Sequence, residues 1–356
     1  MAKPADGGNL KSDRRYSNTR GAVAITAWAG VLLVALVVSL TMGRYGIPVG
    51  TLGTLLRLRA SGAVPTDTAL LQAYNILFLV RIPRLFLSAL TGAALALSGA
   101  AYQNIFRNPM VSPDILGVTT GAGVGAAVGI LISASTFFIH VFAFGLGLGA
   151  VLLVMLVARL VSKDRANTVV LVLTGMVVNA LFQAVLSFTK YVADTSTKLP
   201  EITFWLMGSF AKSGNYANVR LLAVVFVVGA LPLYLLRWRI NILSFGDEES
   251  RAMGLNPRQI RTVVILCSTL LTATCASLCG SIQWVGLIIP HIARLMVGAN
   301  NKYLFPVSIL GGGAFMLVVD DFARTIPGEL PVGVLTAFVG APLFIYMLFR
   351  GKKELF

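Results

Sequence analysis

Polar residues that recur inside an apolar stretch are the first positions of this sequence where chemistry could take place. Four of them, spaced four residues apart in one uncharged run, are Gly175, Asn179, Gln183 and Ser187. This spacing places side chains on one face of a helix, and the face drifts slowly around the axis. Because polar groups are costly in hydrocarbon, such a face usually borders a water-filled path or a neighbouring helix. The pattern predicts either a wall of a hydrated pathway or hydrogen bonding between helices, and both interpretations stay open.

A second group of interest is a pair of carboxylates, Asp320 and Asp321, which ends another apolar stretch one turn before Arg324. Asp321 and Arg324 are three residues apart, which is the spacing of an ion pair on a helix surface. Local charge pairing is therefore the simplest interpretation. The alternatives are a carboxylate that couples transport to protons and a docking site that faces outward.

The segment Gly246–Gly254 has the pattern of a short helix within a polar loop, 237–261. Its three consecutive acidic residues, Asp247–Glu249, suit a helix N-terminus. Gly254 suits a C-terminal cap, and Pro257 prevents the helix from continuing. Because crossing a membrane does not require such a helix, the segment predicts a contact for a partner protein. An ordinary helix at the membrane surface is the alternative.

Nucleotide binding is not supported by any segment of the chain. The sequence contains no G-x-x-x-x-G-K-[ST] phosphate loop, and its only Gly-Lys pair is Gly351-Lys352 at the tail. The glycine-rich run 117–129 lies in an apolar stretch without a preceding soluble strand. We interpret that run as close packing of helices through small residues.

Metal binding and enzyme catalysis lack their usual residue sets as well. The two histidines, His140 and His291, are too few and too far apart for a metal site, and no Ser/His/Asp set or H-E-x-x-H motif is present. The sequence therefore predicts no catalytic residue, no metal and no cofactor in this chain. The cysteines share one apolar run with no metal-site spacing and are predicted to be small buried residues: Cys267, Cys275 and Cys279.

The amino-acid composition indicates whether the chain folds in water or in a lipid bilayer. Of 356 residues, 56% are hydrophobic and only 12% are charged, whereas soluble chains have about 25% charged residues. The mean hydropathy is +0.82. A soluble protein could not bury this much apolar surface, so we expect an all-α membrane protein.

The hydropathy pattern predicts about ten transmembrane helices. The first is the uncharged stretch from Gly21 to Gly43, which at about 1.5 Å per residue is long enough to cross a bilayer. It exceeds the apolar region of a signal peptide, so we expect it to be retained. The ten predicted spans are 21–43, 85–105, 114–133, 139–160, 168–189, 219–236, 262–280, 282–298, 304–322 and 331–349.

The distribution of basic residues predicts the orientation. With the N-terminus inside, 19 of the 29 Lys and Arg residues fall on the inner side. This bias predicts that both termini are cytoplasmic. It also explains most of the net charge of +15 as a topology signal, so no nucleic-acid partner is expected.

The expected domain organisation is one membrane domain between two short tails. Residues 1–20 are expected to form a cytoplasmic tail, 21–350 a single transmembrane domain, and 351–356 a second cytoplasmic tail. Loop 237–261 then faces the cytoplasm, so the partner predicted for its short helix is a cytoplasmic protein.

Seven sequence pieces, in order along the chain, resemble the permease subunits of type II ABC importers in the iron-chelate and vitamin B12 uptake family. The similarity covers residues from about 25 to 350. One piece alone, such as R-I-P-R, is weak, but seven in order are specific. The pieces are Arg81–Arg84, Leu97–Pro109, Ser112–Gly117, Trp205–Ser209, Arg251–Leu255, Gly280–Arg294, and Asp320–Arg324 followed by Glu329–Gly333 and Gly340–Pro342.

The resemblance implies a vitamin B12 importer permease-like fold and a set of partners. These are a second copy of the chain, two ATPase subunits that bind ATP-Mg, and a periplasmic or lipid-anchored substrate-binding protein. It implies that Arg81, Arg84 and Arg324 dock the binding protein. The implied ATPase-coupling residues are Glu248, Arg251, Ala252, Met253, Gly254 and Leu255.

The resemblance also assigns residues to the path itself. It matches the helix with Gly175, Asn179, Gln183 and Ser187 to a pathway-lining helix. It matches Asn108, Met110, Asn167 and Thr168 to positions near the cytoplasmic gate. This chain departs from many relatives at Gln283-Trp284, where they have glycine and phenylalanine, which affects the expected packing at the start of the eighth span.

The function that follows is a permease of the bacterial inner membrane, without enzymatic activity of its own. An iron chelate such as a siderophore or haem is the expected substrate, with cobalamin or an oxyanion such as molybdate as other possibilities. The alternative from another class is an ion-coupled secondary transporter with Asp320 or Asp321 as its proton site. Both aspartates lie at a helix end rather than at mid-membrane, which argues against that alternative.

Overall fold

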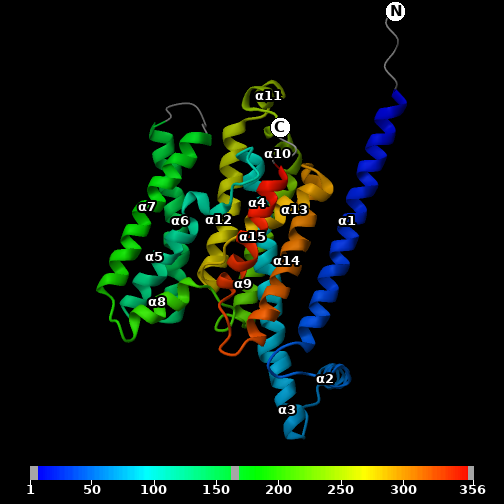
Figure 1. The fold of residues 1–356 in the computed structure, drawn as a ribbon, viewed down its shortest axis with the longest axis vertical. Helices are drawn as coiled ribbons and strands as arrows, with labels where there is room; N and C mark the ends of the chain where they lie inside the picture. Colours follow the sequence, from blue (N-terminus) through cyan, green and yellow to red (C-terminus); the bar gives the residue numbers. More distant parts are fainter. Residues whose placement is uncertain (1–6, 162–167, 352–356) are drawn as a thin grey trace, which may run out of the picture.

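The protein is entirely helical over the residues described by the computed structural model, 7–161 and 168–351 (Figure 1). Fifteen α-helices are joined by a π-helical turn, Ile76–Arg81, and a 3₁₀ turn, Pro113–Leu116. The α-helices are α1 Gly7–Thr41, α2 Val49–Ser61, α3 Thr68–Asn75, α4 Ile82–Ile105, α5 Val118–Leu131, α6 Thr136–Val161, α7 Thr168–Val192, α8 Lys198–Leu206, α9 Tyr216–Leu235, α10 Arg237–Leu243, α11 Asp247–Ala252, α12 Pro257–Cys279, α13 Val285–Val297, α14 Asn301–Thr325 and α15 Val332–Gly351.

Each of the ten predicted spans corresponds to a helix in the described part of the chain. Seven helical segments are long and apolar enough to cross a membrane, which confirms a multi-pass helical fold. Three apolar helices are shorter, namely α5, α13 and the part of α15 up to Met347. The prediction of a full span at 114–133 was wrong at its start, because Pro113–Leu116 forms a 3₁₀ turn and Gly117, with φ of 79°, separates it from α5.

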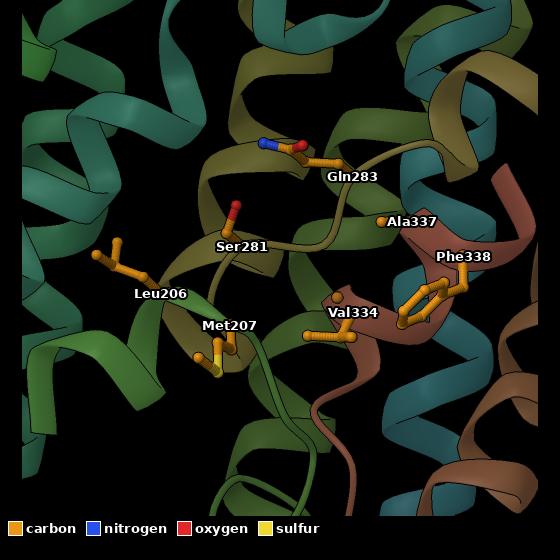
Figure 2. A pocket seen from close by; sticks show the side chains of 8 residues that line it. Leu206, Met207, Ser281, Gln283, Val334, Ala337 and Phe338 are labelled. Atoms are coloured by element: carbon orange, nitrogen blue, oxygen red, sulfur yellow. The ribbon is translucent and has the colours of Figure 1, made fainter. Parts of the chain in front are cut away.

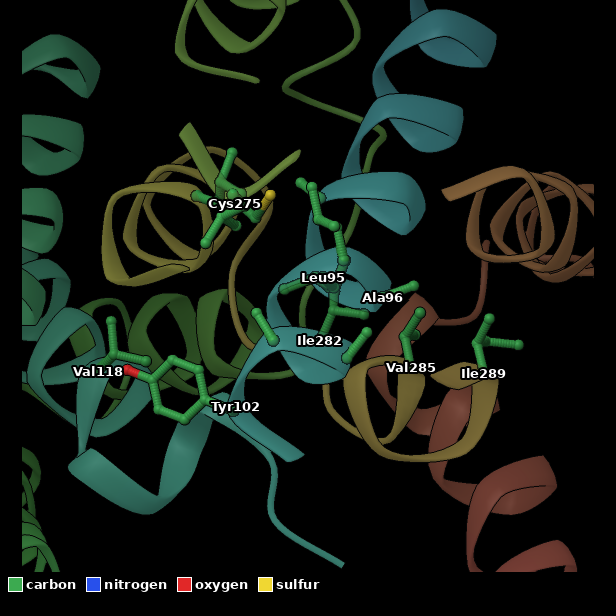
Figure 3. Close-up of a cluster of buried hydrophobic side chains, with 14 of the residues drawn as sticks. Leu95, Ala96, Tyr102, Val118, Cys275, Ile282, Val285 and Ile289 are labelled. Carbon is green, nitrogen blue, oxygen red and sulfur yellow. The ribbon is translucent and has the colours of Figure 1, made fainter. Parts of the chain in front are cut away.

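Helix α4 lies at the centre of the bundle. It packs against α14, α12, α13 and α9, and nearly all of its residues from Pro83 to Ile105 are buried. Small residues permit this close approach: a Cβ added at Gly99 would overlap the carbonyl oxygen of Gly286 on α13. Figure 3 shows large side chains around the same helix, including Leu95 and Tyr102.

The glycine-rich run in α5 packs one helix closely against another, as its sequence predicted. A Cβ at Gly125 would overlap the carbonyl of Phe142 on α6, and one at Gly121 would overlap that of Leu146. The prediction of buried cysteines is confirmed for Cys275 and Cys279, whereas Cys267 is only half-buried; all three are free thiols.

The two ends of the bundle carry different elements (Figure 1). Helix α11 lies at one end, where α1 begins and α15 ends. At the opposite end, α2 and α3 project beyond the bundle, and the link between α14 and α15 turns. From the distribution of basic residues, we refer to the α11 end as the inner end and to the other as the outer end.

Candidate functional site

The inner end presents α11, the short helix predicted from Gly246–Gly254. Its acidic residues occupy the first turn, and Gly254 takes a left-handed conformation with φ of 76°. The amide of Gly254 donates to the carbonyl of Arg251 at 2.9 Å, which ends the helix. Pro257 does more than stop α11, because it is the first residue of α12, with Asn256 as its N-cap.

The coupling residues expected from the resemblance lie on this helix and on the three residues that follow it, and all but Leu255 are exposed. Met253 is 61% exposed. Leu255 is half-buried and packs against the main core, which ties the surface to the bundle. The other members, all exposed, are Glu248, Arg251, Ala252 and Gly254. This arrangement offers a partner protein a small patch with both charged and apolar groups.

Polar contacts hold α11 against the bundle on the face of α11 that points toward the other helices. Ser250 is buried and donates to the carbonyls of Gly246 and Ile242. Asp247 pairs with Arg261 of α12, with 2.9 Å between Nη2 and Oδ1. It also pairs with Arg107, which follows α4, at 3.4 Å. The sequence pattern did not predict Arg107 and Arg261 as partners of Asp247, because both lie outside the segment Gly246–Gly254.

The residues expected at the cytoplasmic gate are only partly described. Asn108 and Met110 are exposed on the link between α4 and the 3₁₀ turn, where the Asn108 side chain accepts the amide of Met110 at 2.9 Å. Thr168 begins α7 and is half-buried. Asn167 lies outside the described residues. The gate role of these four positions stays a prediction.

The polar face of α7 does not stay on one side of the protomer. Gly175 is buried, and a Cβ there would overlap the carbonyl of Ile115, so it packs within the protomer instead of bordering an open path. Asn179 is half-buried and accepts a hydrogen bond from Thr120 of α5. Gln183 and Ser187 are exposed.

The different surroundings of these four residues of α7 follow from helix geometry. At about 100° per residue, a spacing of four drifts by about 40° each step, so positions twelve residues apart differ by about 120°. Hydrogen bonding between helices therefore describes Asn179, whereas Gln183 and Ser187 keep the pathway role as a prediction. Gly175 is the member for which the pathway interpretation does not fit the packing.

The outer end contains a buried cluster of charged residues, which we call the outer ion cluster: Arg81, Arg84, Arg324, Asp320, Asp321 and Glu329. Arg84 pairs with Asp320 through both Nε and Nη2, the latter at 2.8 Å from Oδ1, and its Nη1 lies 3.1 Å from Glu329. Two elements far apart in sequence, the start of α4 and the end of α14, are joined by this pair.

Most other polar groups of the outer ion cluster also find partners within the chain, although the buried Nε of Arg324 makes no hydrogen bond. Arg324 pairs with Asp321, as the spacing of three predicted, and Ser39 of α1 donates to the same aspartate at 2.5 Å. Arg81 donates to the carbonyls of Leu40 and Tyr45 at 2.5 and 2.7 Å.

The expectation that these three arginines form an exposed docking rim does not fit this burial. Arg81, Arg84 and Arg324 are 4%, 6% and 6% exposed, respectively. Arg84 and Arg324 pair with carboxylates of the same chain, and Arg81 donates to two backbone carbonyls, so a partner's carboxylates would have to compete with these contacts. Docking through these residues stays a prediction that now requires the outer ion cluster to open.

The same geometry weighs against Asp320 as a proton-coupling site. Its side chain is fully buried and is engaged by Arg84, with Arg324 3.8 Å away. Both of its carboxylate oxygens accept hydrogen bonds from the guanidinium group of Arg84. Asp320 therefore holds α4 to α14 and offers no free carboxylate to bind a proton in transit.

A cavity of about 500 Å³ lies between the end of α8, the non-helical segment 280–284 and α15 (Figure 2). Its walls are mostly apolar, with Met207 and Phe338 among them, and its polar side chains are the uncharged Ser281 and Gln283. In the sequence, Gln283 was marked only as a residue that differs from the glycine of many relatives. The signal that could have found the cavity is a pair of polar residues between two adjacent apolar stretches.

Trp284 explains part of the shape of this region. It precedes α13 with φ of 73°, a left-handed conformation that a bulky residue rarely adopts. Its ring contacts Phe344 of α15 edge-on, with 6.1 Å between centroids. The segment that carries Ser281 and Gln283 is thus fixed to α15 at its far end.

Comparisons with known proteins agree with this geometry. The sequence profile of the FecCD transport family matches residues 31–350, a range that contains every candidate residue above. The molybdate import system permease protein MolB of Haemophilus influenzae is 40% identical over 324 residues, which cover 91% of this chain and 94% of that protein. An iron chelatin transport system permease protein of Helicobacter pylori is 39% identical over 285 residues, 79% of this chain and 85% of that protein.

One solved structure extends the comparison to three dimensions. It is an inward-facing conformation of a metal-chelate type ABC transporter, which superimposes with a TM-score of 0.80 at 36% sequence identity. The superposition covers 93% of this chain and 99% of that one. The similarity in structure therefore extends over nearly the whole of both chains.

Proposed function

We propose that this chain, which belongs to the FecCD transport family, carries a ferric chelate across the bacterial inner membrane. It is a permease subunit of an ABC importer and a multi-pass membrane protein, and such subunits are not themselves enzymes. The family resemblance stated from its motifs is confirmed. The observation that carries the proposal is the 36% identity with a metal-chelate type transporter along 93% of the chain.

The proposed assembly has two copies of the chain, two ATPase subunits and a substrate-binding protein. The exposed surface of α11 supports an ATPase contact, because this six-residue helix and Met253 just after it, 61% exposed, have no packing role of their own on that side. The exposed polar side chains of Gln183 and Ser187 on α7 support a contact between two copies around a water-filled path, because lipid would not solvate them. The ATP-Mg cofactor would be held by the ATPase, with none in this chain.

The proposed cycle is alternating access driven by the partners. The loaded binding protein docks at the outer end, and ATP binding closes the two ATPase subunits. The closure displaces α11 and is passed to the helices around the path. The permease supplies the path and makes no covalent bond.

The cavity beside α15 supports a large substrate with little net charge. Its volume of about 500 Å³ lies within the usual range for small-molecule sites, and two copies around an axis would offer a wider space. Its polar groups, Ser281 and Gln283, are neutral. A metal enclosed in an organic chelator matches such walls better than a bare ion, which requires charged or polar ligands around it.

Molybdate is the second candidate substrate, because the MolB relative is named for it and is 40% identical to this chain. The test is uptake by the purified permease, ATPase and binding protein in proteoliposomes. We would offer ferric siderophores, haemin, cobalamin and molybdate in turn, with ATP inside or outside the vesicles. ATP-dependent uptake of a ferric chelate is the expected result, and uptake of molybdate alone would overturn the substrate proposal while leaving the importer intact.

A further inference from the structure

Asp247 stands at a junction between three elements of the inner end. It is the first residue of α11, and its carboxylate meets Arg261 of α12 and Arg107 at the end of α4. Both guanidinium groups approach the same oxygen, Oδ1, at 2.9 Å from Arg261 and 3.4 Å from Arg107. Within the described residues, it is the acidic residue of α11 that forms ion pairs with other elements.

The two contacts differ in strength. Arg261 has a side chain only 2% exposed and binds with two nitrogens, since its Nη1 also lies 3.4 Å from Oδ2. Arg107 has a side chain 43% exposed and makes one long contact. A buried two-point contact fixes Asp247 to α12. A single contact of this length at the surface is weak and is easily broken by a small movement.

Arg107 lies where a movement would matter. It follows α4 directly, with only Phe106 between, and α4 is the buried helix at the centre of the bundle. Its backbone is left-handed, with φ of 52°, and the next residue begins the exposed link that includes Asn108 and Met110. A force on Arg107 therefore reaches both the end of the central helix and this link.

We infer that the Asp247–Arg107 ion pair is made in one position of α11 and broken in another, so that it holds or releases the link beyond α4 and makes both residues positioning residues of the transport cycle. The inference rests on the proposed function, because it requires a motor protein that displaces α11. Arg261 keeps Asp247 attached to α12 throughout. The contact with Arg107 forms or opens as the motor moves α11, so the link beyond Arg107 is held in one state and released in the other.

The test uses the whole complex in proteoliposomes and two variants, Arg107→Gln and Asp247→Asn, alone and together. Two readouts are needed: the amount of ATPase that co-purifies, and the substrate transported per ATP hydrolysed. Arg107→Gln should retain normal assembly and lower transport per ATP by about 2- to 5-fold, the factor expected from a weak ion pair. The double variant should be no worse than Asp247→Asn alone, because both remove one interaction.

Matched controls are available on neighbouring helices. Arg239→Gln removes an exposed base from α10, and Arg258→Gln removes an exposed base from α12. Both should leave transport per ATP unchanged. Arg107→Gln is the decisive variant, because Asp247→Asn also takes the partner from buried Arg261 and could impair folding.

Three results would overturn the inference. These are an unchanged transport ratio for Arg107→Gln, an additive loss in the double variant, and a loss of ATPase assembly caused by Arg107→Gln. A wild-type permease that purifies without any ATPase would instead contradict the proposed function, before any variant is compared. The two failures are therefore distinguishable.

Discussion

Gly254 shows how one residue shapes the partner-facing surface. Its φ of 76° lies in the left-handed region, and a Cβ added there would meet no atom of this chain within 4 Å. Backbone conformation, rather than space within the protomer, is therefore the reason for glycine. The open space beside it is available to a partner, so a side chain at this position would affect both the chain and its contact.

We expect Gly254→Val to destabilise the permease slightly and to impair coupling strongly. Adopting the left-handed conformation costs about 1–2 kcal/mol for a residue with a Cβ. Thermal unfolding in detergent measures this cost, and stimulation of the ATPase by loaded binding protein measures coupling.

Gly62→Val is the matched control for this prediction. Gly62 ends α2 at the opposite end of the protein with φ of 71°, and its Cβ would also meet no atom within 4 Å. It should show a similar loss of stability with normal ATPase stimulation. Equal stimulation in the two variants would refute the assignment of α11 as the ATPase contact.

At the scale of elements, the outer ion cluster joins helices that the sequence places far apart. The Arg84–Asp320 pair spans 236 positions and joins α4 to α14, while Ser39 brings in α1. The sequence predicted the pair within α14, because a spacing of three is a local rule. It could not predict the pairing with Arg84, since that depends on how α4 and α14 pack.

Asp320→Asn should therefore destabilise the fold rather than alter ion coupling. Removing the carboxylate leaves Arg84 and Arg324 with one fewer counter-charge in a buried place, which costs about 3–5 kcal/mol for a broken buried pair. Thermal unfolding in detergent checks this, with the exposed Glu201→Gln as the control that should show no change. The result that would contradict the structural role is an Asp320→Asn permease that unfolds at the wild-type temperature.

The same reasoning changes the expectation for charge reversal at the outer end. Arg84→Glu would place a third carboxylate beside Asp320 and Glu329, so we expect loss of folded protein along with any loss of docking. A docking experiment with this variant is informative only when folding is measured in parallel.

At the scale of the whole molecule, the sequence predicted the helical membrane fold and the positions of all ten principal helices. Hydropathy predicts the spans because each transmembrane helix must form its backbone hydrogen bonds within itself. The apolar pattern of a span is therefore visible in its own sequence. The short length of α13 and the cavity beside Ser281 and Gln283 were not predicted. Both depend on the non-helical segment 280–284, in which Gly280 and Trp284 have positive φ and Trp284 contacts Phe344 of α15, a contact that local hydropathy does not indicate.

Transport by this permease is proposed to be driven by a separate ATPase, and one purification tests this most directly. Tagged protein would be isolated in mild detergent, its partners identified, and the complex reconstituted for uptake with ATP or with a proton gradient. We predict a co-purifying ATPase with a phosphate loop, in about equal copy number, and uptake that requires ATP. A protein that purifies alone and drives uptake from a proton gradient without ATP would contradict the account.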